Sequence, residues 1–137
     1  MVETLKHTEG AEQIKIDINC AINFKLLSDE KRLIVILNNL IGNAIKYRDD
    51  KKKKLFIEVS AQNKESGYEI SITDNGLGIK QEFLSKIFDM FYRASESSTG
   101  SGLGLYIVKE TVEKLKGKIE VQSEFGVGTS FTLLLPK

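Results

Sequence analysis

The stretch ISITDNGLGIKQEF, from Ile70 to Phe83, decides between two interpretations of the fold. Asn-Gly between apolar alternations is the strongest short signal for a β-hairpin, so DNG would ordinarily be a turn between two strands. The residues that follow argue against a hairpin, because IKQEFLSKIFDMF spaces its apolar residues closer to a helical period than to strand alternation. We therefore expect the chain to leave the sheet at Asp74, and DNGLG to be a loop that holds something.

Strands are predicted on both sides of this loop. Upstream, LFIEVSAQ and YEISITD alternate strongly and are joined by NKESG, which predicts a hairpin that ends at Asp74. Downstream, KIEVQSEFGVGTSFTLLL predicts two strands around a glycine-containing turn, with Pro136 beyond the last. IKIDI, from Ile14 to Ile18, predicts one more strand, and INF, from Ile22 to Phe24, is a candidate partner for it.

Two stretches have helical periodicity. The first takes Ser28 as its N-cap and repeats apolar residues at Leu33, Leu37, Leu40, Ile41 and Ala44. The second, LGLYIVKETVEKLKG, places Leu105, Val108, Val112 and Leu115 on one face and ends at Gly117 as the C′ residue. Strands that come as hairpins, mixed with two helices, predict an α+β two-layer sandwich: a mixed, mostly antiparallel sheet with helices on one face.

Composition narrows the class of protein. The 137 residues are one domain's length, of which the polar, aperiodic residues 1–13 are interpreted as a linker and 14–137 as the domain. Twenty Lys and Arg against nineteen Asp and Glu argue against a nucleic-acid partner, and KKKK, Lys51 to Lys54, is interpreted as a solvated turn without function. The single Cys20 fits a reducing compartment, and no apolar run approaches the roughly 18 residues that span a bilayer, so we expect a cytosolic chain.

A polar stripe interrupts the first helix. Asn39, Asn43 and Lys46 follow the spacing i, i+4, i+7, and Tyr47 lies beside them. Buried amides need partners, and the phosphates of a nucleotide with Mg²⁺ would supply them, because an amide oxygen is a hard ligand and lysine neutralises phosphate. A polar helix edge that faces solvent is an equal alternative from these residues alone.

Glycines cluster in three motifs. Seven of the eleven glycines lie in DNGLGI, GSGLGL and GVGT. GSGLGL directly precedes a predicted helix, whose N–H groups and dipole favour an anion. The spacing is not that of the dinucleotide fingerprint, and no G-K-[ST] follows as in a P-loop, so another kind of phosphate site is indicated.

Asp74 is the candidate specificity residue of that site. A carboxylate at the mouth of a glycine loop can accept a hydrogen bond from an exocyclic amine. Adenine presents an amine there and guanine a carbonyl, so Asp74 would select ATP over GTP.

Together, these motifs closely resemble a known family. NNLIGNAIKY, DNGLGI, IFDMFYR, GSGLGLYIVK and GVGTSF are similar, in order and spacing, to the N, G1, F and G2 boxes and the closing G-x-G-T turn of the catalytic ATP-binding domain of bacterial sensor histidine kinases. The match runs from about Asp29 to Leu135. It implies the Bergerat fold, shared with heat-shock chaperone, mismatch-repair and type II topoisomerase ATPases.

The resemblance also implies roles for the matched residues. On the helix, Asn43 would bind magnesium, Asn39 would contact phosphate or metal, Lys46 would meet phosphate and Tyr47 would line the nucleotide site. Asp74 would bind the adenine amino group, with Gly76, Gly78 and Ile79 on that wall of the site and Thr129 in support. Arg93 would reach the terminal phosphates, and Gly100, Gly102, Leu103, Gly104 and Leu105 would line the phosphate side and hinge a lid. Phe88 and Phe91 would anchor that lid, although plain core aromatics are an equal alternative.

The implied activity is that of a protein histidine kinase. Such a domain binds ATP and Mg²⁺ and transfers the γ-phosphoryl group to a histidine on a separate dimerisation domain, from which a response regulator takes it. The hydrolysing relatives place a glutamate four residues before the magnesium asparagine, where this chain has Asn39, which favours a kinase over an ATPase.

The chain lacks its own phosphate acceptor on this interpretation. The single histidine, His7, has no downstream proline as in the family's acceptor motif, so the fragment alone should not autophosphorylate. We expect a monomer that is the cytoplasmic part of a membrane-bound sensor, with residues 1–13 left from the linker to the missing dimerisation domain. The alternatives are an anti-sigma-factor-type serine kinase and a non-enzymatic ATP-sensing module.

Overall fold

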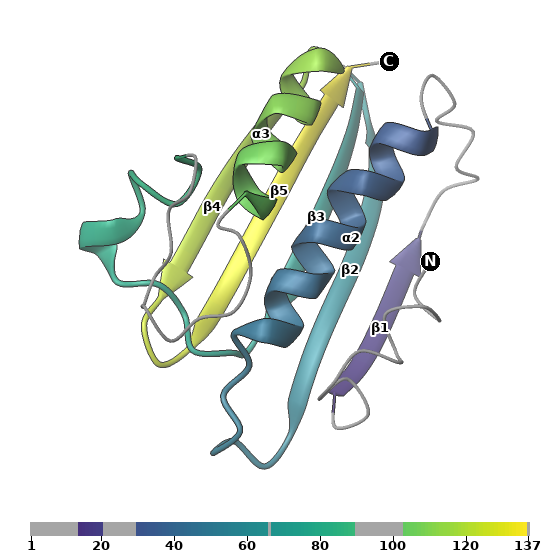
Figure 1. Cartoon of the computed structure of the whole chain (residues 1–137). Helices are drawn as coiled ribbons and strands as arrows, with labels where there is room; N and C mark the ends of the chain where they lie inside the picture. The colour runs from purple at the N-terminus through teal and green to yellow at the C-terminus, as the bar shows by residue number, and fades with distance from the viewer. Residues whose placement is uncertain (1–13, 21–29, 66, 90–102, 137) are drawn as a thin grey trace.

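Strands and helices are mixed along the chain (Figure 1). The computed structural model describes residues 14–20, 30–65, 67–89 and 103–136. Within them the elements are β1 (Ile14–Cys20), α2 (Glu30–Lys46), β2 (Leu55–Lys64), β3 (Gly67–Asp74), the 3₁₀ turn η2 (Gln81–Phe83), α3 (Gly104–Lys114), β4 (Lys118–Glu124) and β5 (Gly128–Pro136).

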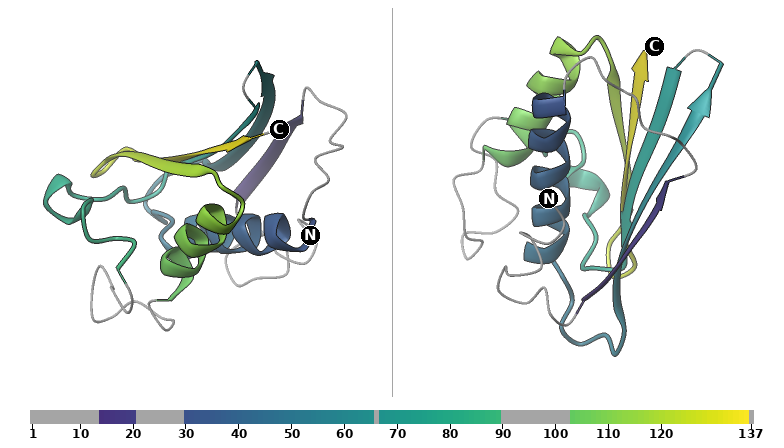
Figure 2. Two further views of the ribbon diagram at one scale, coloured as in Figure 1. Left: turned by 90° about the horizontal axis from the view of Figure 1, so that it is seen from above. Right: turned by 90° about the vertical axis from the view of Figure 1, so that its right-hand side faces the viewer.

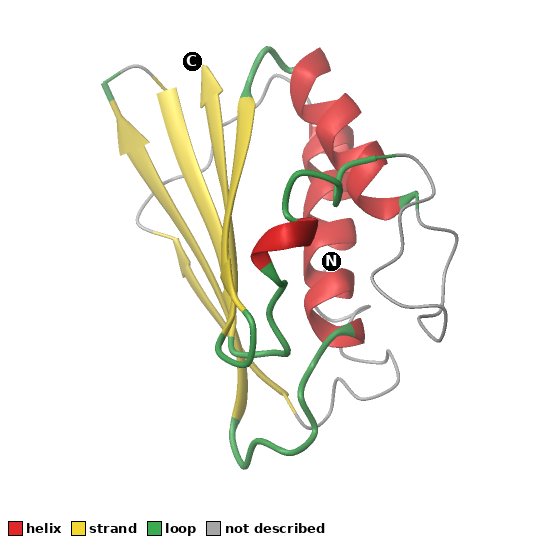
Figure 3. Ribbon diagram, turned by 90° about the vertical axis from the view of Figure 1, so that its left-hand side faces the viewer, coloured by secondary structure: helices red, strands yellow, loops and turns green. Residues whose placement is uncertain are grey.

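The described strands form one sheet in the order β1-β2-β3-β5-β4. β1 runs parallel to β2, and the other neighbours are antiparallel. Figures 2 and 3 show α2 and α3 side by side on one face of this sheet, with the other face bare among the described residues. The predicted two-layer α+β sandwich with a mixed, mostly antiparallel sheet is confirmed.

The core lies between the two layers. The inward positions alternate along β2 and β5 as period-two patterning requires, and α2 and α3 cover them with apolar stripes. The side chains that are at most 2% exposed are Ile36, Leu40, Ile41, Ile45, Ile57, Ile70, Ile72, Val108, Val112 and Leu133. This face of the sheet, with its helices, carries the candidate site at its lower end in Figure 1.

The segment after DNGLG answers the question raised by the opening stretch. No strand follows β3 directly; the chain passes into η2 and further single turns, with Lys86 N–H bonded to the Phe83 carbonyl (2.9 Å). DNG is therefore not a hairpin tip. The apolar spacing of this segment reflects 3₁₀-type turns in the described residues 79–89 and not an α-helix.

The predicted end of α3 is wrong by one residue. Gly117 donates to the Val112 carbonyl (3.0 Å) and Lys116 to the Glu113 carbonyl (2.9 Å), which is the bond pattern of a Schellman motif. Lys116 therefore holds the C′ position, with φ of 61°, and Gly117 follows it. Gly117 is needed for another reason: a Cβ there would lie 2.6 Å from the Leu134 carbonyl oxygen. The predicted N-cap Ser28 and the strand Ile22 to Phe24 lie outside the described residues.

Candidate functional site

Asp74 lies at the end of the central strand and points toward the helices. It pairs with Ile57 of β2 on one side and Thr129 of β5 on the other. It shares its face of β3 with the buried Ile70 and Ile72, because side chains alternate along a strand. The Gly76 N–H donates to Asp74 Oδ1 over 2.8 Å, which turns the chain out of the sheet.

Burial makes Asp74 an unusual carboxylate. Desolvation raises the pKa of Asp74 above its ordinary value of 3.8, and hydrogen bonds from the backbone of Gly76 and Thr129 and the charge of Lys52 act in the opposite direction. A half-buried carboxylate with unused acceptor capacity is suited to a donor group on a ligand.

The loop after Asp74 packs against the end of α2. The Leu77 N–H donates to the Tyr47 carbonyl over 3.0 Å. A Cβ on Gly76 would lie only 2.7 Å from that same oxygen, so only glycine fits. Gly78 has φ of +75°, and a Cβ there would collide with the Glu124 carbonyl, so the second glycine is required by both conformation and space.

Ser123 of β4 joins this loop to the buried Thr129. Its Oγ accepts from the Ile79 N–H (2.7 Å), donates to the Gly128 carbonyl (2.9 Å) and lies 2.8 Å from Thr129 Oγ1. A serine has one hydroxyl proton, and Ser123 uses it in the hydrogen bond to the Gly128 carbonyl. Thr129 must therefore be the donor in its hydrogen bond with Ser123. The lone pairs of the Thr129 hydroxyl, next to Asp74, are then left to accept from a ligand or water. Sequence reasoning missed Ser123, because its link to the Asp74 loop depends on Ile79, which is 44 positions away in the chain.

The polar stripe of α2 borders the same region. Asn39 donates from Nδ2 to the Val35 carbonyl (2.8 Å), and its Oδ1 would lie 3.3 Å from a Cβ on Gly104, so glycine there leaves room between α2 and the start of α3. Lys46 Nζ lies 5.2 Å from the centre of the Tyr47 ring. Among the described residues, the Asn43 side chain has no hydrogen-bond partner, which leaves its amide for a ligand.

The donor set fits a magnesium ion that is bound largely through phosphate. No group of three or more His, Cys, Asp or Glu in the described part of the chain could hold a metal. Mg²⁺ typically keeps several waters and takes one or two protein oxygens together with substrate phosphates. Amide oxygens on the α2 stripe, beside a lysine, suit that arrangement.

The structure brings most of the predicted site residues to one end of the molecule. Contacts join the α2 stripe to the Asp74 loop and to the start of α3, where Leu103 caps the helix and its carbonyl accepts from the Ile107 N–H (2.8 Å). Leu105 packs against the core, as does Phe88, whose ring lies 6.3 Å from that of Phe131 in an edge-on contact. The core-aromatic alternative therefore holds for Phe88. Phe91, Arg93, Gly100 and Gly102 lie outside the described residues.

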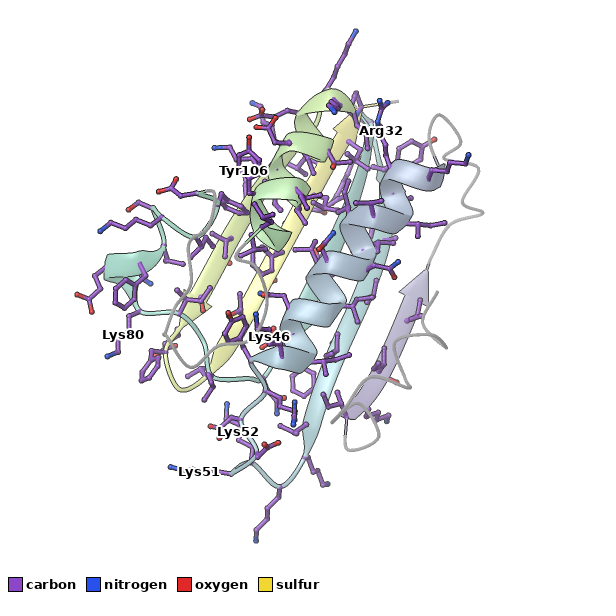
Figure 4. The ribbon with its side chains drawn as sticks, in the orientation of Figure 1. Arg32, Lys46, Lys51, Lys52, Lys80 and Tyr106 are labelled. Atoms are coloured by element: carbon purple, nitrogen blue, oxygen red, sulfur yellow. The ribbon has the colours of Figure 1, made fainter. Side chains whose placement is uncertain are left out.

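The interpretation of Lys51 to Lys54 as a solvated turn is wrong for one residue. Lys52 is half-buried, and its ammonium donates to backbone carbonyls of the Asp74 loop and of the β4–β5 turn. Asn75 also fastens this tract, because its side chain donates to the Lys54 carbonyl (2.7 Å) and accepts from the Phe56 N–H (2.9 Å). Figure 4 labels Lys46 at the end of α2 and Lys52 below it, on the segment that leads to β2.

Comparison with known proteins places this geometry in a family context. The sequence profile of the family described as histidine kinase-, DNA gyrase B-, and HSP90-like ATPase matches residues 28–137. The chain is 40% identical over 120 residues to the sensor protein RprX of Bacteroides fragilis, covering 85% of this chain and 23% of RprX. It is 34% identical over 137 residues to the sensor-like histidine kinase SenX3 of Mycobacterium tuberculosis, covering 96% of this chain and 33% of SenX3. The chain thus spans about a third or less of these curated relatives.

Solved structures share the fold. Full-length ShkA in complex with AMPPNP superposes with a TM-score of 0.81 at 29% identity, over 98% of this chain and 28% of that one. The mycobacterial sensor histidine kinase MprB gives a TM-score of 0.79 at 27% identity, over 98% and 88% of the two chains. Neither helix in the described ranges has the length and apolar character needed to cross a membrane.

Proposed function

Because the chain belongs to the histidine kinase-, DNA gyrase B-, and HSP90-like ATPase family, we propose that it binds Mg-ATP and transfers the γ-phosphoryl group to a histidine on a separate dimerisation domain. The observation that carries this proposal is the half-buried Asp74, whose carboxylate accepts from backbone N–H groups and keeps further lone pairs for a ligand, at the edge where the two glycine loops and α2 meet. The chain covers about a third or less of each of these curated relatives, and the proposal assigns the acceptor histidine to a domain other than this one.

Asp74 recognises the base. A remaining lone pair of its carboxylate accepts a hydrogen bond from the adenine amino group, and Gly76, Gly78 and Ile79 form that side of the site with their backbones. The Thr129 hydroxyl, whose proton is committed to Ser123, supports this end as an acceptor. Guanine presents a carbonyl oxygen at this position, and two acceptors cannot form a hydrogen bond with each other. The site therefore prefers ATP over GTP.

The α2 stripe receives the phosphates. Asn43 offers an amide oxygen to Mg²⁺, Asn39 contacts phosphate or metal, and Lys46 neutralises phosphate charge while Tyr47 lines the site. When bound, Mg²⁺ neutralises charge that develops on the transferring phosphoryl group. The backbone from Leu103 to Leu105, with Gly104 giving room beside Asn39, completes this side. We assign Arg93, Gly100 and Gly102 to the terminal phosphates and the lid on family resemblance alone.

Transfer is favoured over hydrolysis. Asn39 stands one helical turn before Asn43, where a general base would be needed to activate water, and an amide cannot accept a proton. Transfer of the bound γ-phosphoryl group therefore requires a nucleophile from outside this domain. The dimerisation domain of the parent protein supplies that histidine, and a response regulator then takes the phosphate. The chain works as a monomeric catalytic unit on the cytoplasmic side of a membrane-bound sensor.

Phosphate transfer to a separate acceptor tests the proposal. The chain is incubated with γ-labelled ATP, first alone and then with the histidine-bearing domain of its parent protein. We expect label only on the added domain, and we expect it to be lost in acid, as phosphohistidine is. Acid-stable label on serine would instead indicate a serine kinase, and tight ATP binding without transfer would indicate a nucleotide-sensing module. An acceptor domain with its histidine replaced by alanine is the matched control.

A further inference from the structure

Lys52 makes an unusually complete set of contacts for a lysine in a charged tract. Its Nζ lies 2.7 Å from the Asn75 carbonyl oxygen, 3.2 Å from that of Gly76 and 3.0 Å from that of Val127. An ammonium group has three hydrogens, so all of them are used by these main-chain acceptors. The acceptors belong to two loops: the one that follows Asp74 and the turn between β4 and β5.

A second contact reaches the same loop from the same tract. The Asn75 side chain donates to the Lys54 carbonyl and accepts from the Phe56 N–H, so it bonds the main chain of this tract in both directions. The Gly126 N–H also donates to the Leu77 carbonyl (2.7 Å), so the two loops contact each other directly. Lys52 sits where these segments converge and is the charged residue among them that faces inward.

We propose that Lys52 is a positioning residue, which fixes the loop after Asp74 against the β4–β5 turn and so sets the adenine end of the nucleotide site. This inference rests on the proposed function, since it takes the base to lie against Asp74. Lys52 spends its hydrogens on carbonyls and has none for a phosphate. Its influence on nucleotide binding is therefore indirect. It acts on the part of the site that binds the base and not on the part that binds the phosphates.

Electrostatics add to the geometry. The charge of Lys52 favours the ionised form of Asp74, which is the form that accepts from an amine. The other groups of the described chain that act on this carboxylate are the backbone N–H groups of Gly76 and Thr129. A single side chain thus holds the loop and favours the charge state needed for recognition.

The test compares Lys52→Met with Lys53→Met. Methionine keeps much of the apolar stem and removes the ammonium, and Lys53 is an exposed neighbour in the same tract, so its substitution is the control. Calorimetry measures Kd for ATP and for ADP, hydrogen exchange follows the amides of Leu77 and Gly126, and circular dichroism verifies folding. Lys52→Arg serves as the conservative variant, since it restores charge and donors.

We expect Lys52→Met to weaken the binding of ATP and of ADP by the same factor, about tenfold in Kd, which is the scale of a lost charge-assisted hydrogen bond. The Leu77 and Gly126 amides should exchange faster, Lys52→Arg should recover most of the affinity, and Lys53→Met should match the wild type. Equal losses for ATP and ADP are the signature of an effect at the base, which the two nucleotides share.

Four results would overturn the inference. Wild-type affinity in Lys52→Met, while Asp74→Asn loses binding, would show that Lys52 does not position the site. A larger loss for ATP than for ADP would mean that Lys52 contacts the terminal phosphate. If the wild type bound no nucleotide, the proposed function would fail and the inference with it. Should Lys52→Met not fold, unchanged binding and exchange in Lys52→Gln, which keeps only part of the donor set, would reject it.

Discussion

Replacing Gly76 with alanine should damage both the fold and the nucleotide site. The added Cβ would lie 2.7 Å from the Tyr47 carbonyl oxygen, whereas ordinary contact begins at 3.4 Å, so the loop must retreat by about 0.7 Å. Tyr47 cannot yield easily, because its N–H is bonded to the Asn43 carbonyl of α2 (3.0 Å) and its own carbonyl already accepts from Leu77. Overpacking of this kind costs about 1–3 kcal/mol of the free energy of unfolding.

The same movement displaces the wall of the site. Binding groups must be held to within about 0.5 Å of their productive geometry. A shift of this size next to Asp74 should weaken ATP binding by about 10- to 100-fold, since a 1 Å misplacement can cost about 100-fold. The loss should exceed any effect that follows from reduced stability alone, because a domain with 5–15 kcal/mol of stability, roughly the usual range, stays folded.

Gly42 offers a control, because the same substitution there should change the free energy of unfolding in the opposite direction. It lies within α2, and a Cβ there would meet nothing within 4 Å. Gly42→Ala should therefore stabilise the protein by about 1 kcal/mol through helix propensity. Urea unfolding of both variants, with ATP titration of each, separates local crowding from a general response to added methyl groups. A Gly76→Ala variant that is as stable as Gly42→Ala and binds ATP like the wild type would contradict this prediction.

Three further outcomes follow from the structure. Lys116→Gly should raise the free energy of unfolding by about 0.5–1 kcal/mol, because the left-handed C′ position is costly for a side chain; unchanged urea unfolding would contradict this. Asp74→Asn should unfold at a higher temperature than the wild type at pH 7. The pKa of Asp74 is raised in the folded protein, so the wild-type protein loses stability as the pH rises through that pKa, whereas the amide does not ionise. The difference in unfolding temperature should vanish below pH 3.8. Asn43→Ala should reduce the ATP affinity in Mg²⁺ to the value measured without it, and a retained magnesium effect in calorimetry would reject the metal assignment.

Much of the fold could be predicted because its signals are local. Period-two alternation identified β2, β3, β4 and β5, and helical periodicity identified α2 and α3. The departure from the sheet after Asp74 followed from the spacing of the next apolar residues. Gly76 and Gly78 were found for the right physical reason, since both positions exclude a Cβ.

The remainder depends on contacts that sequence periodicity does not encode. Lys52 reaches acceptors 23 and 75 positions away, and nothing in KKKK distinguishes it from its exposed neighbours. Ser123 likewise gains its role only when Ile79 lies beside β4. The end of α3 was misjudged because Gly117 suggested a left-handed residue, while that glycine is required by the close approach of β5.

The most direct test of the central claim is a calorimetric titration with ATP and with GTP, each with and without Mg²⁺, on the wild type and Asp74→Asn. We expect that ATP binds, that Mg²⁺ strengthens ATP binding and that GTP does not bind. Asp74→Asn should lose about 1–3 kcal/mol, roughly 5- to 150-fold in Kd, because a donor replaces the acceptor that faces the adenine amine. Equal affinity for the two nucleotides, or an unchanged Kd in Asp74→Asn, would contradict the assignment of this site to adenine.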